Sequence, residues 1–335
     1  MDTGRMSTST PASPDTRSPV THVPFSDAVL PAVDMSVPPW PGADRESGGV
    51  KLHVRETPGP DGVTAVYVHG LGGSATNWTD LAGQLSGYVP GIALDLPGFG
   101  RSEPPRDFDY SIPNHADAVA RFIRGLDVGP VHLFGNSMGG AISMYVAADH
   151  PDLVRTLTLV SPAVPDLRPR TSRMSDPRLA LAFLPLVGAS FRRRLAAEPM
   201  ETRVMRLLNL CFADSSKIPE SRRREAGEEF EERARQAWSN PALARSTIGL
   251  FRSWLVPRSK SMWTLAPRIE APTLVVWGTE DKLVTVRKAP RTAQLIPRGR
   301  LLVLPRTGHV AQMERPATVA RAVLGMWEQV ADGRW

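Results

Sequence analysis

The sequence predicts an α/β fold in which a mostly parallel, doubly wound sheet is interrupted by an inserted helical segment. Short apolar runs alternate with helical stretches along most of the chain, which is typical of parallel sheets. Between about residues 165 and 267 helical stretches occur without strand signals, and the alternation then resumes. A chain of 335 residues with 41% hydrophobic and 22% charged residues can bury a large core.

The expected elements before the insertion follow one another in a regular order. Alternation at 50–56 predicts an antiparallel edge strand, and the other strands are buried ones. The buried strands are expected at 63–68, 91–96, 131–134 and 154–160, and the helices at 78–85, at 114–126 and directly after Ser137. After the insertion, strands are expected at 273–277 and 301–304, with helices at 286–295 and 318–330.

Residues 1–47 predict a flexible N-terminal tail, because Ser, Thr, Pro and Asp dominate them without any periodicity. We expect Trp40 to dock the end of this tail onto the folded domain. Pro24 and Pro31 interrupt the apolar stretch that a secretory signal would need, so a cytoplasmic location is expected. The chain also lacks a run of about 20 apolar residues that could span a membrane.

Three segments organise the remainder of the chain. Residues 48–164 and 268–335 predict one core domain, and residues 165–267 predict a helical cap. The insertion follows a strand of the sheet, whose carboxyl edge is where open α/β sheets bind ligands. The cap is therefore expected to lie over the ligand site.

Charge and cysteine content exclude several classes of function. The net charge is +6, but the basic residues are scattered among acidic ones, so no nucleic-acid partner is expected. Cys211 is the single cysteine, and no intrachain disulfide can form. No His, Asp and Glu cluster has metal-ligand spacing and Gly98-Phe99-Gly100 does not open a phosphate-binding helix, so neither a metal nor a cofactor is expected. The sequence carries no signal for an oligomeric state.

The nucleophile candidate is Ser137, in the stretch Gly135-Asn136-Ser137-Met138-Gly139. A buried strand precedes this turn and a helix follows it, which is the context that a nucleophile elbow requires. Glycines on both sides allow the chain to approach itself closely and lift the serine hydroxyl out at the end of the strand. The N–H of Met138, at the start of the helix, is then placed to stabilise an oxyanion.

A serine needs a base, and the base needs an orienting acid. Among the seven histidines, His309 alone follows a predicted strand in a carboxyl-edge loop. Asp281 follows the neighbouring strand after a short turn and is preferred to Glu280, whose side chain should point elsewhere. The expected triad is Ser137, Asp281 and His309.

From about residue 48 to its end, the chain resembles the α/β-hydrolase family. The resemblance is carried by the order of the triad and by five motifs: 69–73, 95–100, 135–140, 278–281 and 308–309. It implies that the N–H of Leu71 is the second oxyanion donor. Gly70 and Gly72, which flank Leu71, are expected to let the backbone approach the substrate.

Family chemistries that use a carboxylate nucleophile, the epoxide hydrolases and haloalkane dehalogenases, do not fit Ser137. Ester hydrolysis of a small apolar molecule or lipid is the favoured reaction. The alternative is carbon–carbon hydrolysis, because the elbow and the segment after Gly308 resemble the meta-cleavage-product hydrolases. That group tends to have Gly-Pro-Gly in the oxyanion loop and Trp after the histidine, where this chain has Leu71-Gly72-Gly73 and Val310. Cofactor-free perhydrolases and a non-catalytic, ligand-binding hydrolase fold stay open.

The cap is expected to supply an apolar substrate pocket. Its candidate lining residues are Leu181, Phe183, Trp238 and Trp254. The apolar run 179–191 is expected to line this pocket, with contact to a membrane surface as the less favoured alternative. The mixed-sign run 222–233 is expected to be a solvated helix face.

Overall fold

The computed structural model describes residues 22–166 and 198–335. Leu181 and Phe183 therefore lie outside the described residues. An eight-stranded sheet with the order β1-β2-β4-β3-β5-β6-β7-β8 forms the centre of the molecule. The strands are β1 (Gly42–Ser47), β2 (Val50–Thr57), β3 (Ala65–Val68), β4 (Gly91–Leu94), β5 (Val131–Asn136), β6 (Val154–Val160), β7 (Thr273–Gly278) and β8 (Gly299–Leu304).

Strands β3 to β8 run parallel, and β1 and β2 add an antiparallel hairpin at one edge. Gly48 and Gly49, both at positive φ, make the two-residue turn of this hairpin. The expected edge strand is therefore β2, but β1 lies outside it. The expected 1–47 tail is too long, because the polar residues 42–47 pair along their whole length with β2.

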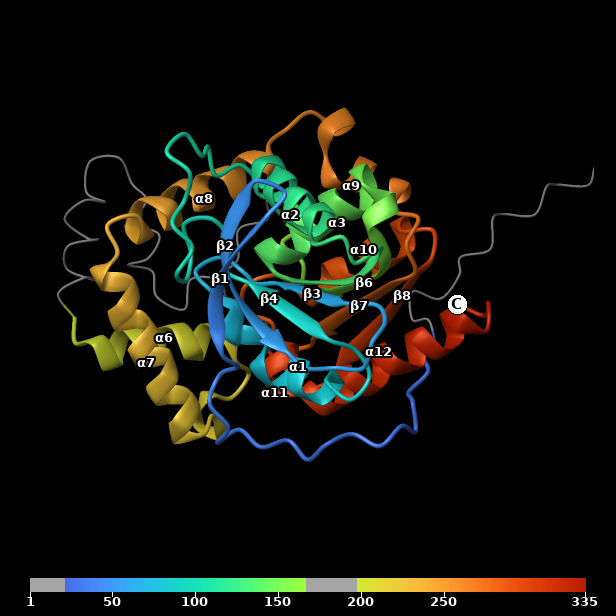
Figure 1. The fold of residues 1–335 in the computed structure, drawn as a ribbon, viewed down its shortest axis with the longest axis horizontal. Coiled ribbons are helices and arrows are strands. Elements are labelled where there is room, and N and C mark those ends of the chain that lie inside the picture. Colours follow the sequence, from blue (N-terminus) through green and yellow to red (C-terminus); the bar gives the residue numbers. More distant parts are fainter. Residues whose placement is uncertain (1–21, 167–197) are drawn as a thin grey trace, which may run out of the picture.

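Helices cover both faces of the sheet (Figure 1). One apolar core packs under α2 (Ile112–Leu126), α3 (Met138–Asp149) and α10 (Ala289–Leu295). The other packs under α1 (Thr79–Leu85), α11 (Ala311–Glu314) and α12 (Pro316–Ala331). The predicted doubly wound arrangement is confirmed, since a parallel strand buried on both faces needs cover on both.

Helices also make up most of residues 198–268, in the described part of the segment between β6 and β7, as the interruption of the strand pattern predicts. The helical insertion, residues 198–268, contains α6 (Met200–Cys211), α7 (Glu220–Arg235), α8 (Ser239–Trp254) and α9 (Met262–Leu265). The mixed-sign run 222–233 lies within α7, and α8 begins after a short break that contains Trp238. Within the described residues no helix is long and apolar enough to cross a membrane.

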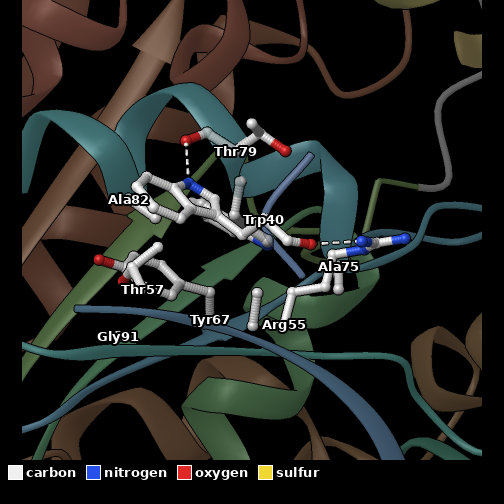
Figure 2. A pocket seen from close by; sticks show the side chains of 10 residues that line it. Trp40, Arg55, Thr57, Tyr67, Ala75, Thr79, Ala82 and Gly91 are labelled. Atoms are coloured by element: carbon white, nitrogen blue, oxygen red, sulfur yellow. Dashed lines mark hydrogen bonds between the residues drawn. The ribbon is translucent and has the colours of Figure 1, made fainter. Parts of the chain in front are cut away.

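Residues 22–41 form an extended strap along the surface rather than a detached tail. The Trp40 indole donates to the carbonyl of Thr79 at 3.1 Å, and Arg55 donates to the Trp40 carbonyl (Figure 2). Trp40 lies against α1, close to Gly83. The expected docking of Trp40 is thus present, and it fixes the end of the strap where β1 begins.

Candidate active site

Ser137 occupies the sharp turn between β5 and α3. Its φ of 53° and ψ of −117° lie outside the regions that non-glycine residues favour, so the surrounding chain must hold this conformation. A Cβ on Gly135 would come within 2.4 Å of the Gly139 carbonyl oxygen, and one on Gly139 within 2.2 Å of the Val68 oxygen. The two glycines are thus required by close backbone packing, as the elbow pattern predicts.

Asp281 and His309 meet at the carboxyl edge of β7 and β8. His309 Nδ1 lies 2.9 Å from Asp281 Oδ2, and the two side chains are 3% and 0% exposed. Asp281 Oδ1 accepts from the N–H groups of Leu283 and Val284, which fixes the carboxylate. Glu280 is exposed, so the structure pairs His309 with the expected acid.

Asn136 links the serine turn to the histidine loop. Its side-chain amide donates to the carbonyls of Val160 and His309 at 3.0 and 3.1 Å. The residue directly before Ser137 therefore holds the backbone of His309. His309 Nε2 is buried and has no hydrogen-bond partner within the described part of the chain.

The loop after β3 lies against the serine turn. A Cβ on Gly70 would come 3.1 Å from Ser137 Cβ, so only a glycine leaves this approach free. Leu71 is half-buried, and Met138 is fully buried as the first residue of α3. Among the described residues, nothing accepts a hydrogen bond from the N–H of either Leu71 or Met138.

His69 fixes the near end of this loop as a neutral imidazole. Its Nδ1 lies 2.7 Å from the Gly70 carbonyl, and its Nε2 accepts from the Leu96 N–H at 3.0 Å. Burial, with a smaller contribution from the nearby Arg233, lowers the pKa of His69 to about 4. The imidazole therefore keeps one donor and one acceptor at neutral pH.

Helix α7 holds the far end of the same loop. Arg233 donates to the Gly72 carbonyl and pairs with Glu229 at 2.9 Å. Glu229 in turn accepts from the hydroxyls of Ser74, at 2.8 Å, and Thr76. The prediction of a solvated face is wrong for these two side chains, which are about one-fifth exposed. The i, i+4 spacing of Glu229 and Arg233 predicts that they pair with each other, but it does not predict their contacts with the loop after β3.

The insertion also contacts the histidine loop through the end of α6. The His309 N–H donates to the Cys211 carbonyl at 2.7 Å, and Lys282 Nζ donates to the carbonyls of Asn209 and Phe212. Glu314 accepts from the N–H groups of Gly308 and Ala213. These contacts, each of which involves at least one backbone group, join the insertion to the loop of His309, and no pattern in the sequence predicts them.

The expected apolar lining residues have different positions. Trp254 is half-buried and donates to the Ala163 carbonyl at 3.0 Å, just beyond the carboxyl end of β6. Trp238 is half-buried at the start of α8, and its indole N–H is without a partner among the described residues. Leu243, which was not expected, lies 3.5 Å from a Cβ built on Gly72 and therefore lies over the loop after β3.

A family model of the alpha/beta hydrolase fold matches residues 66–316. The chain belongs to the α/β-hydrolase family. Residues 66–316 span the insertion as well as β3 to β8, so the match covers the serine turn, the Asp281–His309 pair and the segment between them.

The curated relatives of this α/β-hydrolase include hydrolases named for 2-hydroxy-6-oxo acids. A 2-hydroxy-6-oxononadienedioate/2-hydroxy-6-oxononatrienedioate hydrolase of Comamonas testosteroni is 27% identical, over 82% of this chain and 90% of the relative. A 2-hydroxy-6-oxo-6-(2'-aminophenyl)hexa-2,4-dienoic acid hydrolase of Metapseudomonas resinovorans is 29% identical, over 85% and 90%. Among solved structures, a membrane phospholipase A described as a bacterial virulence factor is 25% identical, with a TM-score of 0.70 and 87% of both chains covered.

Within the described residues, no group of three or more His, Cys, Asp or Glu side chains could hold a metal ion.

Proposed function

We propose that this α/β-hydrolase is a serine hydrolase that cleaves an apolar carboxylic ester through an acyl-enzyme on Ser137. The observation that carries the proposal is the buried Asp281–His309 pair. Among the described residues nothing bonds to His309 Nε2, and Asn136 connects the His309 backbone to the serine turn. A carboxylate on Nδ1 fixes the tautomer in which Nε2 accepts a proton. His309 is then the base, and Asp281 orients it and stabilises its cation.

The reaction uses these groups in two steps, acylation of Ser137 and hydrolysis of the acyl-enzyme. Ser137 Oγ bonds to the acyl carbon while its proton passes to His309 Nε2, and the imidazolium returns that proton to the departing alcohol oxygen. A water molecule then attacks the acyl-enzyme, losing a proton to Nε2, and the acid leaves as the Ser137 hydroxyl reforms. The free N–H groups of Leu71 and Met138 are the proposed donors to the oxyanion in both steps.

The substrate proposed for this site has a medium-sized apolar acyl or alcohol group, and the insertion acts as its cap. Leu243 over the loop after β3 and Trp254 beyond β6 support an apolar pocket. Each methylene buried there contributes about 0.8 kcal/mol, which is roughly fourfold in kcat/KM. The specificity constant should therefore rise along a series of aryl esters until the pocket is full.

Carbon–carbon hydrolysis of a dienoate is the second candidate, favoured by the names of the two curated relatives. Such a substrate carries a carboxylate, and a buried carboxylate needs a cation or several donors. Arg233 contacts the loop after β3 and Lys282 directly follows Asp281, but each is already hydrogen bonded to backbone carbonyls. The phospholipase relationship and the departures at Leu71 and Val310 support the ester.

A fluorophosphonate label tests which residue is the nucleophile. Comparing an aryl ester with a 2-hydroxy-6-oxo dienoate tests which kind of bond the enzyme cleaves. The label should attach to Ser137 and be lost in Ser137→Ala. Ser143 and Ser161 are fully buried, and a label on either would contradict the assignment. A kcat/KM for a 2-hydroxy-6-oxo dienoate that exceeds the best aryl ester by orders of magnitude would replace the ester with the carbon–carbon bond.

A further inference from the structure

Helix α8 has an outer face that combines apolar and cationic side chains. Ile248, Phe251 and Leu255 follow an i, i+3, i+7 spacing and are 47%, 50% and 69% exposed. Arg245 and Arg252 are exposed on the same side of the helix. Exposed apolar side chains that gather on one face in this way indicate an interaction surface. We call these residues, with Arg258 and Lys260 that follow the helix, the α8 face.

The opposite side of α8 is fixed to the core. Ser246 Oγ lies 3.3 Å from His115 Nε2, and Leu250 is buried. A Cβ on Gly249 would come 2.5 Å from the Tyr110 carbonyl oxygen, which shows how closely α8 packs on the loop before α2. In Figure 1, α8 runs along the outside of the molecule. The helix therefore presents its outer face as a rigid surface.

All the charges of the α8 face have the same sign. The sequence contains neither Asp nor Glu between residues 233 and 269. Within the described part of the chain, no carboxylate forms an ion pair with the cations of the face, which are Arg245, Arg252, Arg258 and Lys260. Other arginines of the insertion are paired, for example Arg235 with Glu231. The uncompensated cations thus gather where apolar side chains are exposed.

A groove of about 570 Å³ adjoins this face, between α8 and the start of α2. Arg245, Arg252, Ile248 and Val256 line one side, and Asp109 is the one acid in its lining. Arg245 stacks over Tyr110 with 4.7 Å between its Cζ and the ring centroid. The groove therefore offers two guanidinium groups next to an apolar wall, which suits a phosphate headgroup with its acyl chain.

We propose that the α8 face docks on an anionic phospholipid bilayer. Phe and aliphatic side chains enter the boundary between headgroups and acyl chains, while unpaired cations bind the headgroup phosphates. A second copy of this chain is a less suitable partner. A two-fold contact would place the cations of one α8 face next to those of the other, and like charges repel. The start of the same helix places Leu243 over the loop after β3, so α8 reaches from the bilayer surface to the candidate active site.

Vesicle sedimentation of the full chain tests the proposal. Vesicles of equal parts phosphatidylcholine and phosphatidylglycerol should bind the protein, and added salt or omission of phosphatidylglycerol should weaken binding. Ile248→Ser, Phe251→Ser and Leu255→Ser together should lower the partition coefficient by roughly tenfold or more. Val29, Val33 and Val128 are also exposed apolar residues, and their combined change to Ser should leave binding unaltered.

Two further variants keep the test decisive. If the triple variant does not fold, Leu255→Ser alone should reduce binding several-fold, because Leu255 lies just after the helix and is the most exposed of the three. Arg252→Gln with Lys260→Gln should reduce binding to anionic vesicles and leave the thermal unfolding midpoint unchanged. No binding by the wild-type protein, equal losses in the valine control, or a dimer that only the triple variant disrupts would overturn the proposal.

Discussion

Arg233 on helix α7 donates a hydrogen bond to the carbonyl of Gly72, in the loop that lies against Ser137. The residue therefore joins the helical insertion to the proposed oxyanion loop. On the other side of Leu71, the Gly70 carbonyl is hydrogen bonded to His69. The Gly70 carbonyl and the Leu71 N–H belong to one planar peptide unit, so this hydrogen bond orients the N–H, while Arg233 holds the chain two peptide units further on.

Arg233→Met should lower kcat by about 10- to 100-fold with little change in KM, because it loosens a donor that acts in the transition state. Steady-state kinetics with an aryl ester measures kcat and KM separately. Arg235→Met is the matched control, since Arg235 is 78% exposed and pairs with Glu231 on the same helix. A raised KM with unchanged kcat would instead show that Arg233 binds the substrate directly.

Asp281→Asn should lower kcat by about 10³- to 10⁴-fold while the protein stays folded, because His309 loses the carboxylate that fixes its tautomer. Glu280→Gln should retain nearly full activity, since that side chain is exposed and lies next to the same turn. Turnover of an aryl ester and the circular dichroism spectrum check both variants. A larger loss of activity in Glu280→Gln than in Asp281→Asn would show that Glu280, not Asp281, is the acid.

Helix α1 and the insertion share a buried ion pair between Asp80 and Arg222, at 2.5 Å, with both side chains 9% exposed. Arg222 also donates to the Val37 carbonyl at 2.9 Å. Arg222→Met should reduce the free energy of unfolding by about 3–5 kcal/mol, because it leaves the Asp80 carboxylate buried without its partner.

Urea unfolding measures this change in stability. The double variant Asp80→Asn, Arg222→Met should lose less than the sum of the two single variants, which is the signature of a direct interaction. Arg224→Met is the control, because Arg224 is 66% exposed, and it should cost less than about 0.5 kcal/mol. Additive losses would mean that the two residues stabilise the fold independently.

His115 gives a prediction for the dependence of stability on pH. Burial lowers its pKa to about 3, so the folded protein leaves it neutral where the unfolded chain binds a proton. Its contribution is fully present above the ordinary histidine pKa of 6.5 and is lost as pH falls toward the folded pKa.

The His115→Gln variant should therefore lose less stability than the wild type between about pH 6.5 and pH 5, by about 1.4 kcal/mol per pH unit. Urea unfolding at several pH values measures the difference between the two proteins, in which the contributions of all other titrating groups cancel. His150→Gln is the control, since His150 lies at the end of α3 and is only partly buried. Parallel curves for the wild type and His115→Gln would contradict this origin of acid sensitivity.

The sequence by itself determined the sheet and the positions of the residues proposed for catalysis. Periodicity and glycine placement are local properties, so they locate the strand before Ser137, its turn and the helix after it. Parallel strands bring their carboxyl ends to one edge, so the order of Ser137, Asp281 and His309 along the chain was enough to expect them at the same edge. In the structure, Asp281 is hydrogen bonded to His309 at that edge.

Only the tertiary structure decided which polar and apolar groups face each other across long separations in the chain. Arg233 and Glu229 look like a solvated pair in the sequence, yet they hold a loop about 160 residues earlier. Residues 42–47 are polar and carry no strand pattern, but pairing with β2 makes them a strand. Ile248, Phe251 and Leu255 look like core residues, and only the packing of α8 turns them outward. A side chain's partner depends on the free energy of the whole packed arrangement, which local periodicity does not encode.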